Sequence, residues 1–138
     1  MIAIETLKEV DAWVRERVTY ERDKPVWNIP EDWKTPDRTL ADGKGDCEDF
    51  ALLAAHRLKE LGEDPARMFL CLCHTKGGEG LNHAFLAVET PFGLHTCADT
   101  ADKFGEPAYV HDAYPEEYMR RWMRISEPED WRTWATSD

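Results

Sequence analysis

The apolar residues of this chain change their spacing near Gly62, and this change limits the folds that the chain can adopt. Before Gly62 they recur every three or four residues, which predicts amphipathic helices at 5–18 and 47–61. After it, short continuous or alternating apolar runs predict strands. The strands are expected at 68–73, 83–89 and 94–99. Helices followed by antiparallel strands indicate an α+β domain, with a helix packed on a small sheet.

The remaining segments connect these elements. Residues 21–45 are rich in proline and glycine and are expected to be irregular, packed down by Trp27 and Trp33. Residues 118–125 fit either a strand or a helix. Two loops are expected at 75–82 and 100–116, and Trp131 and Trp134 are expected to cap the core.

The composition fits one domain over residues 1–138, since 42% of the residues are apolar. The net charge of -11 argues against a nucleic-acid partner or an anionic lipid surface. Membrane insertion is not expected, because no apolar run approaches the roughly 18 residues of a span. Residues 1–9 lack a signal-peptide pattern, which predicts a cytoplasmic or phage-associated protein, or a periplasmic one if a signal has been removed.

Cys47 lies where the second helix is expected to begin, after a plausible N-cap at Asp46. Unpaired backbone N–H groups and the positive end of the helix dipole both favour a thiolate at such a position. A histidine, His83, and an aspartate, Asp99, follow in the two predicted strands of a hairpin. Cysteine, histidine and aspartate in this order are typical of a papain-type catalytic triad.

The hairpin register predicts whether His83 and Asp99 meet. If a five-residue loop at 89–93 joins the strands, Val88 lies opposite Leu94, and His83 lies opposite Asp99. Their Cβ atoms would then be about 4.5–5.5 Å apart. A four-residue loop would shift the register by one residue and place one of the two on the wrong face.

In that register, His83 takes the proton of Cys47 and later delivers it to the leaving group, while Asp99 holds the other imidazole nitrogen. The backbone N–H of Cys47 is expected to help bind the oxyanion. Trp33 or Asn28 could supply a second donor. Four other histidines compete for the role of base, and His95 is the strongest rival; the others are His56, His74 and His111.

The three other cysteines have a simpler interpretation. Cys71 and Cys73 share one face of a strand, and with Cys97 they are expected to be buried free thiols. A zinc site formed by Cys71, Cys73 and His74 is the alternative, although the spaced pairs of structural zinc sites are missing. Disulfides are permitted by the even count but are not needed in 138 residues.

The motifs resemble those of the bacterial transglutaminase-like cysteine peptidases. The resemblance covers Trp33 to Pro36, Gly43 to Phe50, His83 to Leu86, and Asp99. It implies a papain/transglutaminase-like fold and a Cys47–His83–Asp99 triad. The family usually has asparagine after the aspartate, whereas Thr100 follows Asp99 here.

The resemblance also implies a calcium site. Better-known members are calcium-dependent periplasmic proteases in which the acids flanking the cysteine belong to that site, which here are Asp46 and Glu48. Carboxylates beside the sulfur would raise the thiol pKa, and a bound calcium ion would offset this effect. The alternative is that these acids only stabilise the start of the helix.

Three functions follow from these residues. The first is a cysteine-dependent hydrolase, a peptidase that cuts a protein or peptide amide through a thioester. The second is a transglutaminase or acyltransferase, in which an amine replaces water at the same acyl-enzyme. The third is a non-catalytic protein-binding module of the same fold, which the acidic surface and six tryptophans would also suit.

Overall fold

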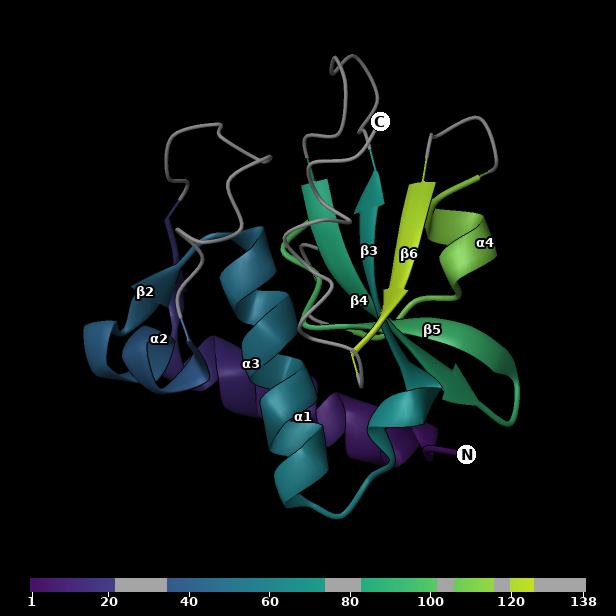
Figure 1. The fold of residues 1–138 in the computed structure, drawn as a ribbon, viewed down its shortest axis with the longest axis horizontal. Coiled ribbons are helices and arrows are strands. Elements are labelled where there is room, and N and C mark those ends of the chain that lie inside the picture. The colour runs from purple at the N-terminus through teal and green to yellow at the C-terminus, as the bar shows by residue number, and fades with distance from the viewer. Residues whose placement is uncertain (22–34, 74–82, 102–105, 116–119, 126–138) are drawn as a thin grey trace.

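The computed structural model describes residues 1–21, 35–73, 83–101, 106–115 and 120–125 of the 138-residue chain. Within these ranges, the chain folds into helices packed on an antiparallel sheet of four strands (Figure 1). The predicted α+β class and the packing of a helix on a small antiparallel sheet are therefore confirmed.

The sheet has the strand order β5-β4-β3-β6. Strands β3 (Met68–Cys73), β4 (His83–Thr90) and β5 (Gly93–Cys97) follow one another in the sequence, and all neighbouring strands are antiparallel. They confirm the three predicted strands. The segment 118–125, which fitted two element types, contains strand β6 (Arg120–Arg124) at the edge beside β3.

Both predicted helices are present, as α1 (Ile4–Arg17) and α3 (Cys47–Glu60). Asp46 is the N-cap of α3, as predicted, and it forms a capping box with Asp49, whose side chain accepts the Asp46 backbone N–H at 3.0 Å. The helix ends just before Gly62, whose φ of 91° is a conformation that glycine adopts without strain.

A short helix, α2 (Pro36–Asp42), was not predicted. The side chain of its N-cap, Thr35, accepts the backbone N–H three residues further on at 3.3 Å, and Gly43 ends it with a φ of 68°. Beyond it, β2 (Lys44–Gly45) pairs in parallel with β1 (Thr19–Tyr20). The segment expected to be irregular therefore ends in regular structure that leads directly into α3.

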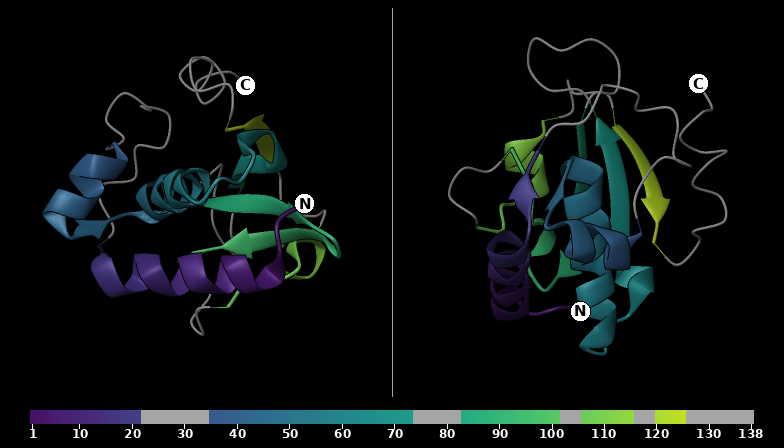
Figure 2. Two further views of the ribbon diagram at one scale, coloured as in Figure 1. Left: turned by 90° about the horizontal axis from the view of Figure 1, so that it is seen from below. Right: turned by 90° about the vertical axis from the view of Figure 1, so that its left-hand side faces the viewer.

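Buried residues form a core on each face of the sheet, because side chains alternate along the strands. Helix α3 packs on one face with α1 beside it along β5, and the short helix α4 (Val110–Ala113) lies on the other face (Figure 2). The larger core joins α1, α3 and the sheet. The smaller core contains Cys71, Cys73, Phe85, Ala87, Val110 and Tyr114.

The predicted register of the β4–β5 hairpin is wrong by one residue. Thr90 pairs with Gly93, so the turn between the strands has two residues instead of the predicted five. Gly93 allows this short turn because it has a φ of 112°, which glycine adopts without strain. If the ladder continued in this register, His83 would face the residue after Asp99. The strand ends at Cys97, however, before that pairing is reached.

The chain leaves β5 at Ala98, which has a φ of 55°. Among the described residues, it is the only non-glycine residue with a positive φ. Such a conformation costs an alanine about 1–2 kcal/mol and interrupts the alternation of side chains along a strand. The Asp99 side chain can consequently point to a different face of the sheet from the one that strand alternation would give it.

Some predictions concern residues outside the described ranges. These are Trp27, Asn28, Trp33, His74, the loop at 75–82, Trp131 and Trp134. Among the residues that are described, no helix has the length and apolar character needed to cross a membrane.

Candidate active site

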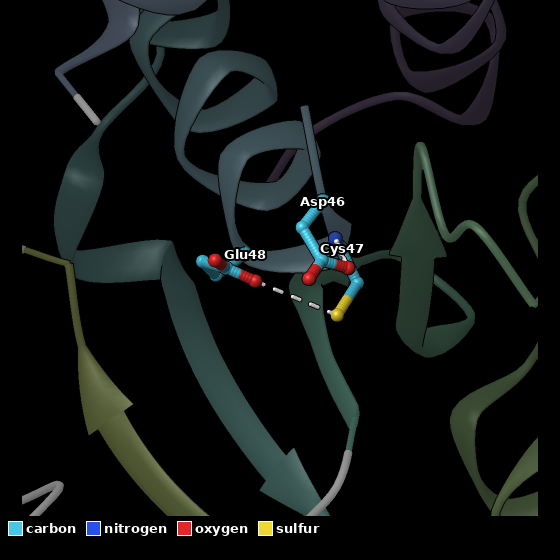
Figure 3. Close-up of side chains that lie close together, drawn as sticks. All are labelled: Asp46, Cys47 and Glu48. Atoms are coloured by element: carbon cyan, nitrogen blue, oxygen red, sulfur yellow. Dashed lines mark hydrogen bonds between the residues drawn. The ribbon is translucent and has the colours of Figure 1, made fainter. Parts of the chain in front are cut away.

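Cys47 is the first residue of α3, where backbone N–H groups have no partner within the helix. The pairing of β1 with β2 holds Gly45 opposite Tyr20 and so fixes how the chain enters this helix. Figure 3 shows the Cys47 thiol beside the carboxylates of Asp46 and Glu48. Its sulfur is 3.6 Å from Glu48 Oε2, and the residue is only 3% exposed.

The surroundings of Cys47 oppose ionisation of its thiol. Burial raises the pKa of Cys47 well above the ordinary value of a thiol, and the charges of Glu48 and Asp46 raise it further. The backbone of Ala84 on β4 acts in the opposite direction. Burial and the charge of Asp46 also raise the pKa of Glu48 to about 8. A reactive thiolate therefore needs a compensating positive charge near this cluster.

His83 and Asp99 are in direct contact. His83 Nε2 lies 2.8 Å from Asp99 Oδ1, and the two residues are 6% and 4% exposed. His83 is the first residue of β4, and Asp99 follows the end of β5. The contact was predicted, but for the wrong reason. The left-handed backbone of Ala98, and not the predicted strand register, lets the carboxylate reach the ring.

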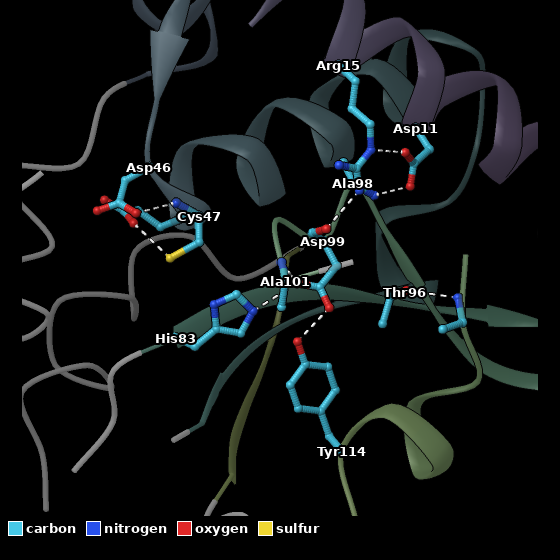
Figure 4. Close-up of polar contacts among 12 residues, drawn as sticks. Asp11, Arg15, Asp46, Cys47, His83, Thr96, Ala98, Asp99, Ala101 and Tyr114 are labelled. Carbon is cyan, nitrogen blue, oxygen red and sulfur yellow. Dashed lines mark hydrogen bonds and ion pairs between the residues drawn. The ribbon is translucent and has the colours of Figure 1, made fainter. Parts of the chain in front are cut away.

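Asp99 has two further partners. Tyr114 Oη donates to Asp99 Oδ2 at 2.5 Å, and the backbone N–H of Ala101 donates to Oδ1 at 3.1 Å (Figure 4). Burial alone would raise the pKa of Asp99, but the hydrogen bond and charge of His83, with the Tyr114 and Ala101 bonds, outweigh it and lower the pKa. Asp99 is therefore a carboxylate at neutral pH, able to accept a hydrogen bond from the imidazole.

Tyr114 was not predicted as a site residue. Its ring stacks on Phe85, with centroids 4.2 Å apart and an angle of 5° between the planes. It also stacks on His83, with centroids 5.9 Å apart. The sequence placed Tyr114 in a loop, and no local pattern there indicates a contact with a residue of the preceding hairpin. Its position depends on α4 packing on the far face of the sheet.

Packing of α3 on β4 brings the start of α3, with Cys47, to the strand that begins at His83. Ala84, whose backbone interacts with the thiol, directly follows His83 in β4. Figure 4 shows the His83 ring between Cys47 and Asp99, with the nitrogen not bonded to Asp99 on the side facing the sulfur. In this view the three side chains appear in the order sulfur, imidazole, carboxylate. Their catalytic roles stay a prediction.

The predicted oxyanion donors stay a prediction. Trp33 and Asn28 lie outside the described residues. The backbone N–H of Cys47 donates to Asp46 Oδ1 at 2.7 Å, so in this conformation it is already engaged. The rival base His95 lies at the hairpin turn, where its Nδ1 is 3.2 Å from Thr90 Oγ1. Asp99 bonds to His83 and not to His95.

One group in the described part of the chain has the composition of a metal site. Potential ligand atoms of Asp46, Cys47 and Glu48 all lie within 4.8 Å of one another. Cys71 and Cys73, considered above for zinc, are free and fully buried in the smaller core, which fits the prediction of buried thiols. The third member of that alternative, His74, is outside the described residues.

The profile of one protein family, bacterial transglutaminase-like cysteine proteinase (BTLCP), matches residues 2–134. The chain belongs to this family. The family resemblance seen in the motifs is therefore confirmed. Because members of the BTLCP family are cysteine proteinases, the predicted enzyme class is confirmed at the level of the family. None of the curated proteins matches the sequence.

Solved structures of LapG from Legionella pneumophila share the fold of this BTLCP member. The calcium-bound form has a TM-score of 0.69 at 21% identity, and the alignment covers 88% of this chain. The chain spans 65% of the length of that LapG structure. An EGTA-treated form has a TM-score of 0.69 at 19% identity and covers 94% of this chain and 74% of LapG. The predicted transglutaminase-like fold is therefore confirmed.

Proposed function

We propose that this BTLCP member hydrolyses a protein or peptide amide through a thioester on Cys47, with His83 carrying protons and Asp99 orienting the imidazole. The contact that supports this proposal best is the buried 2.8 Å bond between His83 Nε2 and Asp99 Oδ1. When Nε2 donates its proton to Asp99, the other ring nitrogen, Nδ1, has a free lone pair. That nitrogen lies on the side of the ring that faces Cys47 (Figure 4).

The proposed reaction has two halves. First, Nδ1 of His83 takes the thiol proton of Cys47, the sulfur forms a bond to the amide carbon, and the imidazolium gives its proton to the leaving amine as the C–N bond breaks. In the second half, His83 takes a proton from water, and the resulting hydroxide attacks the thioester. The C–S bond then breaks, a carboxylic acid leaves, and the proton returns to the sulfur. Asp99 stabilises the imidazolium in both halves and stays ionised.

A calcium ion held by Asp46 and Glu48 is part of the proposal. The ligand atoms of the two residues and of the Cys47 thiol lie within 4.8 Å of one another, and burial makes two negative charges there costly. Carboxylate oxygens are the ligands that calcium prefers, whereas a thiol sulfur is not. The calcium-bound and EGTA-treated forms of LapG are consistent with such a site. When bound, the ion supplies positive charge that offsets the acids which raise the thiol pKa.

The nucleophile is tested by alkylation and by peptide cleavage. All four cysteines are buried, but only Cys47 lies at the start of a helix, so in calcium-containing buffer iodoacetamide should label Cys47 faster than it labels the other three. Cys47→Ala should abolish cleavage of a mixed peptide library, which is followed by mass spectrometry. Cys71→Ala is the matched control, since it removes a buried thiol elsewhere, and it should retain cleavage. Cleavage by the Cys47→Ala protein would rule out the proposed mechanism.

The base is tested by comparing two histidines. His83→Ala should slow both alkylation of Cys47 and peptide cleavage, whereas His56→Ala, on the same helix as Cys47 and 39% exposed in its side chain, should leave both unchanged. Equal effects of the two substitutions would remove His83 from the proposal. Adding an amine with a glutamine peptide distinguishes acyl transfer, because amine incorporation into the product would show an acyltransferase.

Calcium binding is tested by thermal unfolding. Calcium should raise the Tm of the wild-type protein, because an ion that binds only the folded state stabilises it by mass action. Glu48→Gln removes one charged ligand and should abolish this rise. Glu106→Gln is the matched control at an exposed glutamate. A calcium-induced rise that is unchanged in the Glu48→Gln protein would place the ion elsewhere.

A further inference from the structure

Two charged residues lie on the buried side of helix α1, where apolar residues are expected. Asp11 is 1% exposed and pairs with Arg15 one turn later, whose side chain is 27% exposed. The neighbouring buried positions of α1 are Leu7, Val10 and Val14. A buried ion pair adds little to stability compared with apolar residues of the same size. The presence of this pair therefore calls for a role other than stabilising the core.

The pair binds the backbone on both sides of the corner at Ala98. Asp11 Oδ2 accepts the Ala98 backbone N–H at 2.8 Å, and Arg15 Nη2 donates to the Asp99 carbonyl oxygen at 2.7 Å (Figure 4). These two bonds cross more than eighty positions of sequence. They hold Ala98 in place. Its φ of 55° is unfavourable for an alanine.

This corner decides where the Asp99 carboxylate points. In a continued strand, residue 99 would share a face with Cys97, opposite to the face of His83 and Phe85. The left-handed conformation of Ala98 interrupts that alternation, and Asp99 Oδ1 then comes to 2.8 Å from His83 Nε2. The bonds from α1 therefore act on the same backbone turn that makes the His83–Asp99 contact.

We infer that Asp11 and Arg15 are positioning residues that hold Asp99 against His83. This inference rests on the proposed function, since it assigns the pair to the reaction that His83 and Asp99 are proposed to perform. Arg15 contacts the carbonyl oxygen of Asp99 and not its carboxylate. Its effect is therefore on the position of the carboxylate, and the partners of the carboxylate itself remain His83, Tyr114 and Ala101.

The test compares the same substitution at two ion pairs. Arg15→Lys keeps the positive charge beside Asp11 but loses the forked guanidinium that reaches both Asp11 and the Asp99 carbonyl. Arg67→Lys is the matched control, because Arg67 forms a 2.8 Å ion pair with Glu89 on the far end of β4. Both proteins are purified as full chains in calcium-containing buffer, and their Tm values are measured to correct for stability.

Two readouts separate positioning from stability. The first is the proton on His83 Nε2, whose NMR signal reports the hydrogen bond to Asp99 without any catalysis. The second is the rate at which iodoacetamide alkylates Cys47. In Arg15→Lys, the Nε2 proton should move upfield and exchange faster with water, and alkylation should slow roughly ten- to a hundredfold, as expected for a misplaced catalytic group. Arg67→Lys should change neither.

The inference is overturned if the Arg15→Lys protein keeps the wild-type Nε2 signal and alkylation rate. Asp11→Asn provides a second variant, since its amide oxygen still accepts the Ala98 N–H while the ion pair is lost, and it should give the same direction of change in both readouts. Failure of the proposed function looks different. In that case iodoacetamide alkylates Cys47 at the same rate in the wild-type and His83→Ala proteins. The Arg15→Lys substitution still changes the His83 Nε2 proton signal.

Discussion

Tyr114→Phe isolates one hydrogen bond of the site. The hydroxyl of Tyr114 donates to Asp99 Oδ2 at 2.5 Å, and the tyrosine is 5% exposed. Phenylalanine keeps the ring that stacks on Phe85 at 4.2 Å, so the substitution removes the donor with little change in packing. Asp99 is 4% exposed, so water does not readily replace the lost hydroxyl.

The size of the effect follows from the charge of the acceptor. A buried hydrogen bond to an ionised group contributes about 1.5–3 kcal/mol, which corresponds to a fall in Tm of roughly 5–10 °C for a chain of this length. The effect depends on pH because Tyr114 contributes to the lowered pKa of Asp99. A lowered pKa adds stability that is present above the unfolded pKa of about 3.9 and is lost as the pH falls through the lower folded pKa.

Urea unfolding followed by tryptophan fluorescence measures this difference. At neutral pH the Tyr114→Phe protein should be less stable by the full amount. The gap in stability should narrow in acid, as the pH falls below the ordinary aspartate pKa of about 3.9 toward the lowered pKa of Asp99. Tyr109→Phe is the matched control at a tyrosine that is 38% exposed, and it should stay within about 0.5 kcal/mol of the wild type. No loss at neutral pH, or an equal loss in acid, would refute the reasoning.

Three further substitutions test the local structure by urea unfolding. Ala98→Gly should raise the free energy of unfolding by up to about 1 kcal/mol, because glycine adopts the φ of 55° without strain; a clear loss would contradict this. Gly45→Ala should lower it by about 1–3 kcal/mol, since the new Cβ would lie 2.7 Å from Asp49 Cβ, and an unchanged value would show that the capping box can move. Leu53→Ala should lower it by about 2–5 kcal/mol, because Leu53 is fully buried; a smaller loss would mean that the core closes around the cavity.

The helices α1 and α3 and the strands β3, β4 and β5 were predictable from their periodic or continuous apolar patterns, whereas the pattern of 118–125 did not decide between a helix and the strand β6. The helix α2 was not predictable, since its seven residues are too few to show a period. Its start and end signals were nevertheless present. Thr35 and Pro36 stand at its beginning and Gly43 at its end, which is the usual arrangement of an N-cap, a first-turn proline and a terminating glycine.

The geometry of the candidate site could not be predicted from the sequence. The order of Cys47, His83 and Asp99 could be seen in the sequence, and so could the acids around the cysteine. The route by which Asp99 reaches His83 could not, because it depends on a two-residue turn and on a left-handed alanine held from another helix. Tyr114 was missed for a related reason, since its contact with Asp99 exists only once α4 has packed on the sheet.

The electrostatics of Cys47 show why the start of a helix is not sufficient to make a reactive thiolate. A helix terminus stabilises a nearby negative charge by about 0.3–1 kcal/mol, which is less than one pKa unit at about 1.4 kcal/mol per unit. Burial and the charges of Glu48 and Asp46 raise the pKa of Cys47 well above its ordinary value, so they outweigh the helix. Ionisation therefore requires compensating positive charge, for which the proposed mechanism uses both the His83 imidazolium and a calcium ion at Asp46 and Glu48. Since Asp99 stabilises the first and the acids would bind the second, thiol reactivity should depend on both, and losing either should leave Cys47 as inert as the other buried cysteines.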